Sequence, residues 1–423
     1  MKDRLGVGII GAGFMANFHI RSWQGVREAD IVGIVDLNES RARAAAESCR
    51  ALGVGDPKIY RKVSDMVAAP EVDAIWIVAP NNFRVSLMQQ IVDTLESGKG
   101  KLIGIACEKP LALNVGEARK MIELVEQSGV LHAYLENQCH APAVTRGRDI
   151  IWRRGAAVTG PPFLARCAEE HSGPHEPWFW KGEEQGGGVL NDMMCHSIQA
   201  ARFFLSDPAA PKGSLVPKTV NAEIGCLKWA LPHYAEMLKK NSGGQVDYFK
   251  HPAEDFARAT VTFEDANGRQ AVAEVSTSWS YVGPGLRLNF EVMGPEYSLD
   301  SSSLNTDLNI YFSRNVTGKE GEDLVEKQNA EQGMLPVVPS EEIVYGYTEQ
   351  DRQVARAFRE GRQPEVDFYD GLLITQILMT AYMSAEQGRK LAFPPPGLDE
   401  FIPAVAKGTW KAGDLTQGLP PEA

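Results

Sequence analysis

Three places in the chain carry residue types whose spacing suits chemistry, and one of them begins at three consecutive glycines. There the sequence reads GGGVLNDMMCH from residue 186 to residue 196, with Asp192 and His196 four positions apart. On a helix this spacing puts both side chains on one face, about one turn apart. A histidine can take up a hydroxyl proton near neutral pH, and a nearby carboxylate can orient it or bind hydroxyl groups. The alternative is a hydrogen-bonded core histidine and an aspartate that caps the helix.

The second place is the tripeptide Glu108-Lys109-Pro110, which follows the apolar stretch 102–107. Such a stretch predicts a buried strand of a parallel sheet, and open α/β sheets bind their ligands at the carboxyl ends of the strands. Lys109 is therefore predicted to lie at the reacting part of a bound ligand. A solvated lysine at the end of a strand is the alternative.

The third place is the segment 11–16, GAGFMA, which fits the pattern G-x-G-x-x-A. It follows an apolar strand pattern and precedes a helical one, which is the context of a dinucleotide-binding turn. Gly11 would make the tight turn, Gly13 would let a pyrophosphate approach the helix N-terminus, and Ala16 would allow close packing of helix on strand. A glycine turn that binds no nucleotide is the alternative.

An acidic residue, Asp36, ends the second apolar stretch, 25 residues after Gly11. A carboxylate there accepts a hydrogen bond from the ribose 2′-hydroxyl and repels a 2′-phosphate, which favours NAD over NADP as the cofactor. Arg41 and Arg43 follow closely and weaken this preference, because an arginine can bind the 2′-phosphate.

The elements that must position these residues alternate between strands and helices over the first 135 residues. Near-continuous apolar strands with helices between them predict a parallel sheet covered on both faces, which is an α/β Rossmann dinucleotide-binding domain over residues 1–145. The expected strands are residues 5–10, 31–35, 74–78, 102–107 and 131–135, and the expected helices are residues 16–23, 39–52, 64–67, 84–96 and 115–127.

The pattern changes after residue 145. Residues 146–423 predict an α+β C-terminal domain for substrate binding and oligomerisation, with a large, mostly antiparallel open sheet. The polar stretches 227–252 and 315–339 are expected to be loops or insertions, and the Pro- and Gly-rich segment 393–423 an extended surface arm. The expected helices are residues 143–154, 189–205, 349–360 and 370–387, and the expected strands are residues 163–167, 257–263, 270–278 and 286–293.

Composition excludes several classes of protein. The chain has 423 residues and a formal net charge of −12, with 43% hydrophobic and 23% charged residues. The acidic balance argues against nucleic acid or an anionic membrane surface as a partner. No apolar run approaches the ~18 residues that span a bilayer. Six scattered cysteines without a CxxC pair, together with an N-terminus unlike a signal peptide, predict a cytoplasmic protein with reduced thiols.

The glycine turn, the Glu-Lys-Pro tripeptide after the fourth strand and the GGG…D-x-x-x-H helix together resemble the Gfo/Idh/MocA oxidoreductases, a family of sugar and cyclitol dehydrogenases. Segments 367–371 and 381–389 resemble the family's late helix, so the resemblance covers nearly the whole chain except the polar stretches and the arm. It implies an enzyme that transfers hydride between NAD and a CH–OH group of a small carbohydrate. It also implies a homodimer or homotetramer formed through the C-terminal sheet.

The resemblance further implies roles for single residues. Lys109 would hydrogen-bond the reacting hydroxyl, His196 would be the general base, and Asp192 would bind substrate hydroxyls or orient His196. The chain departs from the family at Arg84, where relatives often have histidine, and at 136–140, where they often have an arginine-rich segment. The residues expected to contact the cofactor are Gly11, Gly13, Phe14, Met15, Asp36, Pro80, Asn81, Glu108 and Lys109.

The segment 169–181, EEHSGPHEPWFWK, stands where the family has its substrate loop. Aromatic rings beside carboxylates and histidines suit a carbohydrate, whose C–H faces pack on rings while its hydroxyls take hydrogen bonds. A buried aromatic turn is the alternative. The histidines and cysteine of this region match no common zinc spacing, so no metal is expected. The residues predicted to bind substrate are Lys109, His171, His175, Trp178, Asp192 and His196.

Three functions stay open at this point. The leading hypothesis is an NAD-dependent oxidoreductase that oxidises a secondary hydroxyl of a sugar, glycoside or cyclitol. The second is an NAD-dependent glycosidase that works by transient oxidation and elimination, in which Glu169, Glu170, His171 and His175 serve the extra proton transfers. The third is a non-catalytic NAD-binding sensor, against which the intact set of lysine, aspartate and histidine argues.

Overall fold

The computed structural model describes residues 4–313, 316, 326–327 and 332–412. Contacts between Cα atoms divide the chain into two compact units. Unit 1 holds residues 1–142 and 345–375, and unit 2 holds residues 143–344 and 376–423. Residues 345–375, which the sequence pattern groups with the second domain, cluster with unit 1 because α12 (Tyr347–Arg359) packs against α1 (Phe14–Ser22) and β6 (Leu131–Leu135).

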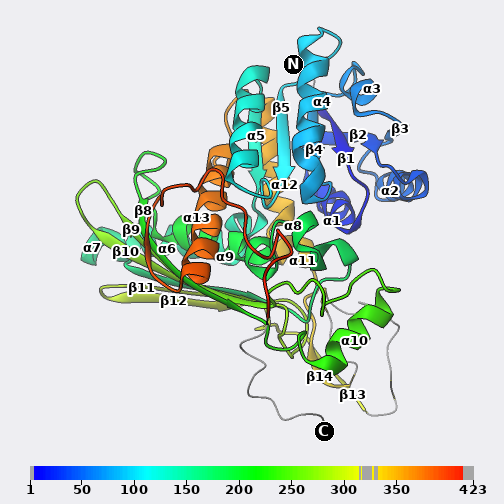
Figure 1. Cartoon of the computed structure of the whole chain (residues 1–423). Coiled ribbons are helices and arrows are strands. Elements are labelled where there is room, and N and C mark those ends of the chain that lie inside the picture. The colour runs from blue at the N-terminus through cyan, green and yellow to red at the C-terminus, as the bar shows by residue number, and fades with distance from the viewer. Residues whose placement is uncertain (1–3, 314–315, 317–325, 328–331, 413–423) are drawn as a thin grey trace. The chain divides into compact units, whose positions relative to one another are not determined.

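Unit 1 is built on a six-stranded parallel sheet with the strand order β3-β2-β1-β4-β5-β6, which confirms the predicted Rossmann fold. Of these strands, β1 to β5 are labelled in Figure 1. Its central strands are apolar along their whole length, and every residue of β1 and β4 is buried. The strands are β1 (Leu5–Ile10), β2 (Ala29–Val35), β3 (Lys58–Tyr60), β4 (Ala74–Ile77), β5 (Gly104–Glu108) and β6. Besides α1 and α12, the helices are α2 (Glu39–Ala51), α3 (Val63–Val67), α4 (Arg84–Glu96) and α5 (Val115–Ser128).

Local signals explain where these helices begin and end. The side chain of Asn38 accepts hydrogen bonds from the first turn of α2, and that of Asn114 does the same for α5. Gly129 ends α5 at a φ of +65°, a conformation that glycine adopts without steric cost. The strand β3 was not predicted, because it has only three residues and its side chains are largely exposed.

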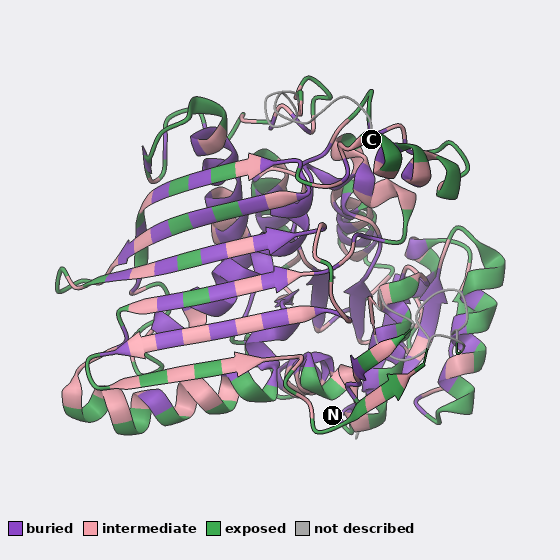
Figure 2. Cartoon of the chain, turned by 90° about the horizontal axis from the view of Figure 1, so that it is seen from below, coloured by how far each residue is buried: buried purple, intermediate pink, exposed green. Residues whose placement is uncertain are grey.

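Unit 2 contains a seven-stranded sheet with the order β12-β11-β7-β10-β9-β8-β15. All neighbouring pairs are antiparallel except β7 with β10, which confirms the predicted open and mostly antiparallel sheet. Buried and more exposed residues alternate along the strands in Figure 2, as expected for a sheet with one covered face. The strands are β7 (Leu164–Glu170), β8 (Val216–Gly225), β9 (Phe256–Glu264), β10 (Gln270–Ser278), β11 (Arg287–Gly294), β12 (Tyr297–Ser302) and β15 (Leu391–Ala392).

The covered face of this sheet packs against α9 (Val189–Leu205), which contacts β7, β9 and β10. Nearly every residue of α9 is buried, so the helix that carries the D-x-x-x-H pattern belongs to the core of unit 2. The long helix α13 (Phe368–Gln387) runs across the boundary between the two units at residues 375 and 376.

Several expectations for unit 2 need correction. The stretch 227–252, expected to be a loop or an insertion, contains the helix α10 (Pro232–Asn241), which begins at a proline and buries Ala235 and Leu238. The single helix expected at 143–154 consists of two elements, α6 (Pro142–Ile150) and a π-helical turn that follows it at Ile151–Ala156.

The two remaining expectations lie partly outside the described residues. Within 315–339, the described part includes β14 (Gly333–Pro336), which pairs with β13 (Asn309–Phe312). In the segment 393–423, residues 394–412 form turns without a helix or strand, and the main-chain N–H of Ala404 donates to Glu386. Residues 413–423 lie outside the described ranges.

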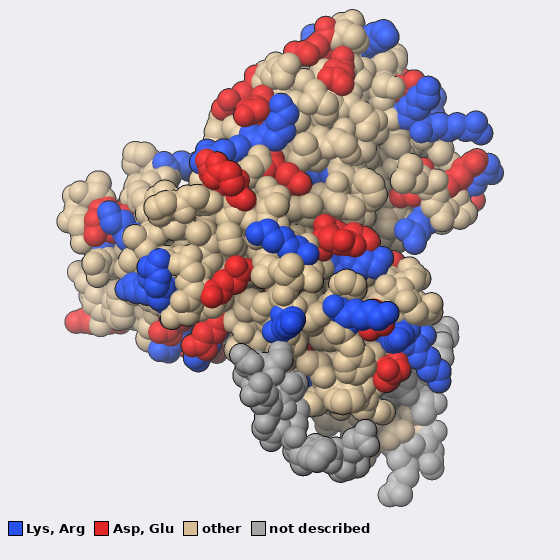
Figure 3. All heavy atoms as spheres, in the orientation of Figure 1, with Lys and Arg blue, Asp and Glu red and all other residues tan. Residues whose placement is uncertain are grey.

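The six cysteines all lie in the described ranges, are buried and form no disulfide bonds with one another. None of the helices in the described ranges combines the length and the apolar character that a membrane span needs. Acidic and basic side chains are interspersed on the face shown in Figure 3.

Candidate active site

A glycine turn connects β1 to α1, as predicted. Gly11 has a φ of +100°, and a Cβ there would lie 3.0 Å from the main chain of Val78 and Ala79, so only glycine fits without strain. Gly13 precedes α1, and a Cβ placed on it would meet no atom within 4 Å. The first turn of α1 has no acidic residue and no side-chain cap. A helix N-terminus that follows such a glycine turn suits the pyrophosphate of a dinucleotide.

Asp36 lies at the end of β2, next to this turn. Its Oδ2 accepts the N–H of Ala12 at 2.7 Å, and its Oδ1 accepts the N–H of Asn38 at 2.7 Å. The carboxylate is thus held at the sheet edge while the residue stays partly exposed. Arg43 pairs with Glu39 at 2.5 Å on the exposed surface of α2. The residues present fit NAD, whose ribose 2′-hydroxyl a carboxylate at this place can bind.

The other expected cofactor contacts follow β4 and begin α1. Pro80 precedes the short 3₁₀ helix Asn81–Phe83, and Asn81 is almost completely buried. Phe14, the first residue of α1, has 40% of its surface exposed, and Met15 is partly buried. Because β1, β2, β4 and β5 are parallel neighbours, their carboxyl ends meet at one edge of the sheet.

Lys109 comes directly after β5, at the same edge. Its main-chain N–H donates to Oε2 of the Glu108 side chain at 3.0 Å. Its carbonyl oxygen accepts a hydrogen bond from Nη2 of Arg84 at 3.1 Å. The main chain of the lysine is therefore held on both sides, and the lysine itself is partly buried.

Behind Lys109, a buried histidine bridges two carboxylates. His19 Nε2 is 3.0 Å from Oε1 of Glu108, and its Nδ1 is 2.9 Å from Oδ2 of Asp351. Burial alone would lower the pKa of His19, but the charges and hydrogen bonds of Asp351 and Glu108 outweigh it and raise this pKa to about 10. The pKa of Glu108 is held below its usual value by His19, against the effect of burial. We call His19, Arg84, Glu108 and Asp351 the Lys109 cluster.

In unit 2, Asp192 and His196 lie in the first and second turns of α9 and are 4% and 3% exposed. The glycines before the helix make room for two other side chains. A Cβ on Gly187 would lie 2.0 Å from the hydroxyl of Tyr382, and one on Gly188 would lie 2.5 Å from the main-chain oxygen of Glu254. The glycines therefore admit protein groups to the start of α9.

Those two side chains cap the helix that carries Asp192 and His196. Oε1 of Glu254 accepts the N–H groups of Gly188 at 3.0 Å and Leu190 at 3.1 Å, and the Tyr382 hydroxyl at 2.5 Å. The hydroxyl of Tyr382 accepts the N–H of Asn191 at 3.3 Å. Burial raises the pKa of Glu254 to about 7, because the hydrogen bonds that favour its charged form only partly offset the loss of hydration. We call Glu254 and Tyr382 the α9 cap.

Asp192 also receives a hydrogen bond from an aromatic cluster. Nε1 of Trp279 donates to Oδ2 of Asp192 at 3.3 Å. The ring of Trp279 packs against Trp180 with a centroid distance of 5.0 Å, and Trp180 packs against Trp229 at 4.9 Å. The aromatic end of the segment 169–181 therefore contributes to the surroundings of Asp192 through Trp180.

The substrate residues predicted within this segment have different environments. His171 is buried, and its Nδ1 accepts the N–H of Gly173 at 2.9 Å. His175 is exposed, while Trp178 is partly buried and stacks on Phe179 with a centroid distance of 3.8 Å. One nitrogen of His171 thus supports the local turn.

Sequence reasoning missed His19, Asp351, Glu254, Tyr382 and Trp279. His19 carried the clearest signal, because a histidine stands on the apolar face of a helix that directly follows the glycine turn. Asp351 and Glu254 carried no such signal, since the neighbouring sequence does not distinguish a buried carboxylate from a solvated one.

Comparison with known proteins gives consistent matches. Residues 5–135 match the family model described as an oxidoreductase family with an NAD-binding Rossmann fold, and residues 156–300 match the model of the GFO/IDH/MocA C-terminal domain. Together the two models match more than half of the chain.

Full-length relatives agree with these matches. Levoglucosan dehydrogenase of Pseudarthrobacter phenanthrenivorans is 25% identical over 393 residues, which cover 89% of this chain and 94% of that protein. The 1,5-anhydro-D-fructose reductase of Ensifer adhaerens is 27% identical and covers 79% of this chain and 83% of its own length. The crystal structure of GenD2 from gentamicin A biosynthesis in complex with NAD has a TM-score of 0.73 and 25% identity, and covers 93% of this chain and 98% of that one.

Proposed function

The chain belongs to the Gfo/Idh/MocA family of oxidoreductases, and we propose that it oxidises a secondary hydroxyl of a sugar, glycoside or cyclitol with NAD. The observation that carries the proposal is the Lys109 main chain, held from both sides at the sheet edge that also bears the glycine turn and Asp36. A lysine so fixed beside a cofactor cradle suits proton-coupled hydride transfer better than a role at the surface.

The residues of the chain have separate tasks in the proposed reaction. Gly11, Gly13 and Asp36 hold the dinucleotide, which supplies the hydride acceptor when bound. Lys109 donates a hydrogen bond to the reacting hydroxyl and so favours loss of its proton. His196 takes that proton as the C–H bond breaks, and Asp192 binds a neighbouring hydroxyl or orients His196. In the reverse direction His196 returns the proton to the carbonyl oxygen.

The names of the relatives narrow the proposed substrate. They include a dehydrogenase of levoglucosan, a reductase of 1,5-anhydro-D-fructose and, in Escherichia coli, a D-glucoside 3-dehydrogenase that is 30% identical over 228 residues, 52% of this chain and 57% of that protein. We therefore expect a sugar derivative whose ring hydroxyls are free. The aromatic cluster of Trp180, Trp229 and Trp279 is itself buried, so it supports the proposal through the hydrogen bond of Trp279 to Asp192 and not through a ring face on which a sugar packs.

The test is a panel of anhydro sugars, glycosides and cyclitols with NAD, in which NADH formation is recorded. Lys109→Met and His196→Asn should each lower kcat by about 10²–10⁴-fold. Lys101→Met and His251→Asn, which change exposed residues of the same types, should not. Wild-type turnover that survives both active-site changes would exclude these roles. Bond cleavage without net NADH formation would instead indicate the glycosidase, and NAD binding without any turnover the sensor.

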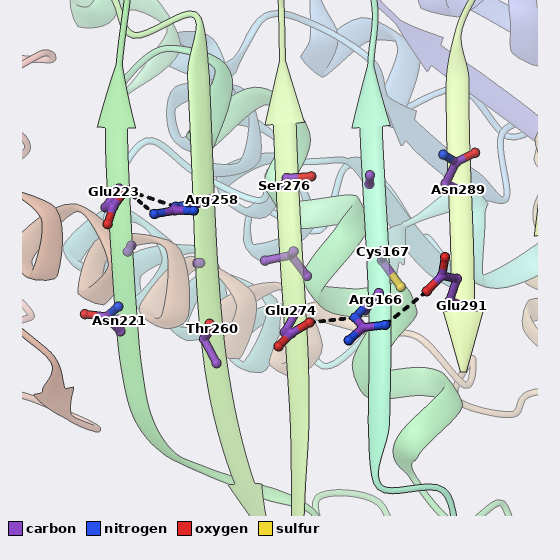
Figure 4. Close-up of a pocket in the computed structure, with 14 residues that line it drawn as sticks. Arg166, Cys167, Asn221, Glu223, Arg258, Thr260, Glu274, Ser276, Asn289 and Glu291 are labelled. Atoms are coloured by element: carbon purple, nitrogen blue, oxygen red, sulfur yellow. Dashed lines mark hydrogen bonds and ion pairs between the residues drawn. The ribbon is translucent and has the colours of Figure 1, made fainter. Parts of the chain in front are cut away.

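We also propose that the chain forms a homodimer or homotetramer through the uncovered face of the unit 2 sheet. A groove of about 590 Å³ runs across this face, and charged and polar side chains form much of its lining (Figure 4). Arg166 pairs with Glu274 at 2.7 Å and with Glu291 at 3.4 Å, and Arg258 pairs with Glu223 at 2.7 Å. These two arginines offset two of the three glutamate charges within the sheet, so a second copy that covered the face would bury a net charge of only −1 from these five side chains.

The mass of the particle in solution, measured by light scattering coupled to size-exclusion chromatography, tests the proposed assembly. Thr260→Arg adds a bulky charge to the middle of this face, and it should give a smaller particle than the wild type. Asn267→Arg, in the exposed turn between β9 and β10, is the matched control and should not change the mass. A monomeric wild-type chain, or an unchanged mass for Thr260→Arg, would contradict the proposal.

A further inference from the structure

Arg84, the first residue of α4, has an unusual set of partners. The residue is 4% exposed, and its side-chain hydrogen bonds within the described residues all go to main-chain carbonyl oxygens. Nε donates to Ala79 at 3.1 Å, and Nη2 donates to Lys109 at 3.1 Å. Nη1 donates to Glu108 at 2.6 Å and also to Pro110. Three consecutive carbonyl groups thus converge on one planar cation.

A buried cation without a bonded carboxylate is costly unless its donors are used. The charge of Glu108 compensates part of this cost, because Arg84 helps to lower the pKa of that carboxyl. An apolar residue could begin α4 without burying a charge at all. The arginine therefore contributes something that packing alone does not, and its five donors in a rigid fork are suited to holding several acceptors at once.

The peptide at Lys109 is held from the opposite side by Glu108. Oε2 of Glu108 accepts the N–H of Lys109 at 3.0 Å, while Oε1 of the same carboxylate contacts His19 at 3.0 Å. Both main-chain polar groups of Lys109 therefore have partners that are themselves buried and charged. The side chain leaves from a Cα whose position is determined by Arg84 on one side and by Glu108 on the other.

We propose that Arg84 is a positioning residue for Lys109, which it serves by holding the carbonyl groups of residues 108–110. The inference rests on the proposed dehydrogenase function for its effect on rate. A displacement of a catalytic group by about 1 Å can cost about 10²-fold in rate, which sets the size of the expected effect. A lysine at residue 84 keeps the charge but loses the fork, so it cannot hold all of these acceptors in one plane.

The first experiment compares Arg84→Met, Arg84→Lys and Arg84→Gly with Arg61→Met, which removes an exposed arginine of the same unit. With the best substrate of the wild type, kcat should fall by about 10²-fold in Arg84→Met and in Arg84→Lys, while the Kd for NAD changes less than about threefold. Methylguanidinium in the buffer should restore part of the kcat of Arg84→Gly, and ethylammonium should not. Arg61→Met should behave as the wild type.

The second experiment does not need activity. Competitive labelling with acetic anhydride, read by peptide mass spectrometry, gives the reactivity of the Lys109 amine against pH, with the exposed Lys101 as the internal reference. In Arg84→Met and Arg84→Lys, the ratio of Lys109 labelling to Lys101 labelling and the pH dependence of this ratio should differ from those of the wild type. In Arg84→Gly, methylguanidinium should move the pH dependence of the ratio back toward that of the wild type.

The outcomes separate the two proposals. A wild type that turns over no member of the panel contradicts the proposed function, and the labelling profile still decides the role of Arg84. If Arg84→Met does not fold, Arg84→Lys carries the test. Arg84→Lys with the kcat and the Lys109 profile of the wild type would overturn the positioning role, as would an Arg84→Gly variant that methylguanidinium leaves unchanged.

Discussion

The two groups of residues proposed to act on the substrate are held by different chemistry. Lys109 in unit 1 depends on the Lys109 cluster, in which two cations and two carboxylates are buried together. Asp192 and His196 in unit 2 depend on the α9 cap, where one carboxyl and one phenol take up the free N–H groups of a helix. The first arrangement is balanced in charge, and the second contains a single acid.

This difference appears in the pKa values of His19 in the Lys109 cluster and Glu254 in the α9 cap. His19 has a pKa raised to about 10, because Asp351 and Glu108 supply two negative charges that outweigh the effect of burial. Burial raises the pKa of Glu254 to about 7, and the hydrogen bonds from a hydroxyl and main-chain N–H groups, which carry no full positive charge, offset this rise only in part. A buried ion with counter-charges stays charged near neutral pH, whereas a buried acid held only by dipoles titrates there.

The largest effect is expected from breaking the charge balance of unit 1. His19→Leu leaves Glu108 and Asp351 buried without the cation between them, which should lower the free energy of unfolding by about 3–5 kcal/mol. Urea unfolding at neutral pH measures it. His19→Gln keeps hydrogen-bonding capacity without charge. If the charge of His19 is what stabilises the fold, this variant should lower the free energy of unfolding by nearly as much as His19→Leu does.

The pH dependence sharpens this prediction. Because the folded state raises the pKa of His19 above its ordinary value of 6.5, the stabilisation is complete below that pH and is lost as the pH rises through about 10. The difference between wild type and His19→Gln should therefore shrink at high pH. The double change His19→Leu with Asp351→Leu should recover part of the loss, and a single change that costs less than about 1 kcal/mol would contradict the charge-balance account.

A smaller effect, with a different pH range, is expected from the α9 cap. Since the folded state raises the pKa of Glu254 from 4.5 to about 7, the wild type should lose stability as the pH rises between these values. The slope from this group is at most about 1.4 kcal/mol per pH unit. Glu254→Gln keeps a carbonyl oxygen for the N–H groups of Gly188 and Leu190, so it should fold and should lack this slope.

The control for the cap is Glu176→Gln, which changes an exposed carboxyl of the same unit. Urea unfolding of both variants and the wild type at a series of pH values gives the comparison. At pH values above 7, Glu254→Gln should equal or exceed the wild type in stability, because it no longer buries a charge. A slope that persists in Glu254→Gln would assign the titration to another group.

Most of the fold, including where several strands end, could be predicted from the sequence. Strands buried on both faces are continuous apolar runs, so β1, β4 and β6 of unit 1 were recognisable, and α9 was recognised over its whole length. In unit 2, β8 was missed because its ladder is irregular between Pro217 and Thr219 and its outward side chains are polar.

The groups that hold the proposed site could not be predicted in the same way. His19 and Asp351 are 332 residues apart, and Glu254 reaches Tyr382 across 128 residues. No local pattern reports that such a carboxylate is buried. Arg84 stood out only as a departure from the family, and its partners are carbonyl groups, which every residue has. Its proposed role depends on the position of residues 108–110 after β5, which only the three-dimensional structure shows.

The smallest expected effect concerns the hydrogen bond that Trp279 of the aromatic cluster donates to Asp192. Trp279→Phe keeps an aromatic ring against Trp180 but removes the indole N–H that lies 3.3 Å from Oδ2 of Asp192. Loss of such a bond costs about 1 kcal/mol, so KM for the sugar should rise by about fivefold, with KM for NAD unchanged. Trp229→Phe is the matched control, because it removes an indole N–H that donates to the main-chain oxygen of Trp279 at 2.9 Å and leaves Asp192 alone. If both variants raise KM for the sugar equally, the cluster acts through its packing and not through the hydrogen bond to Asp192.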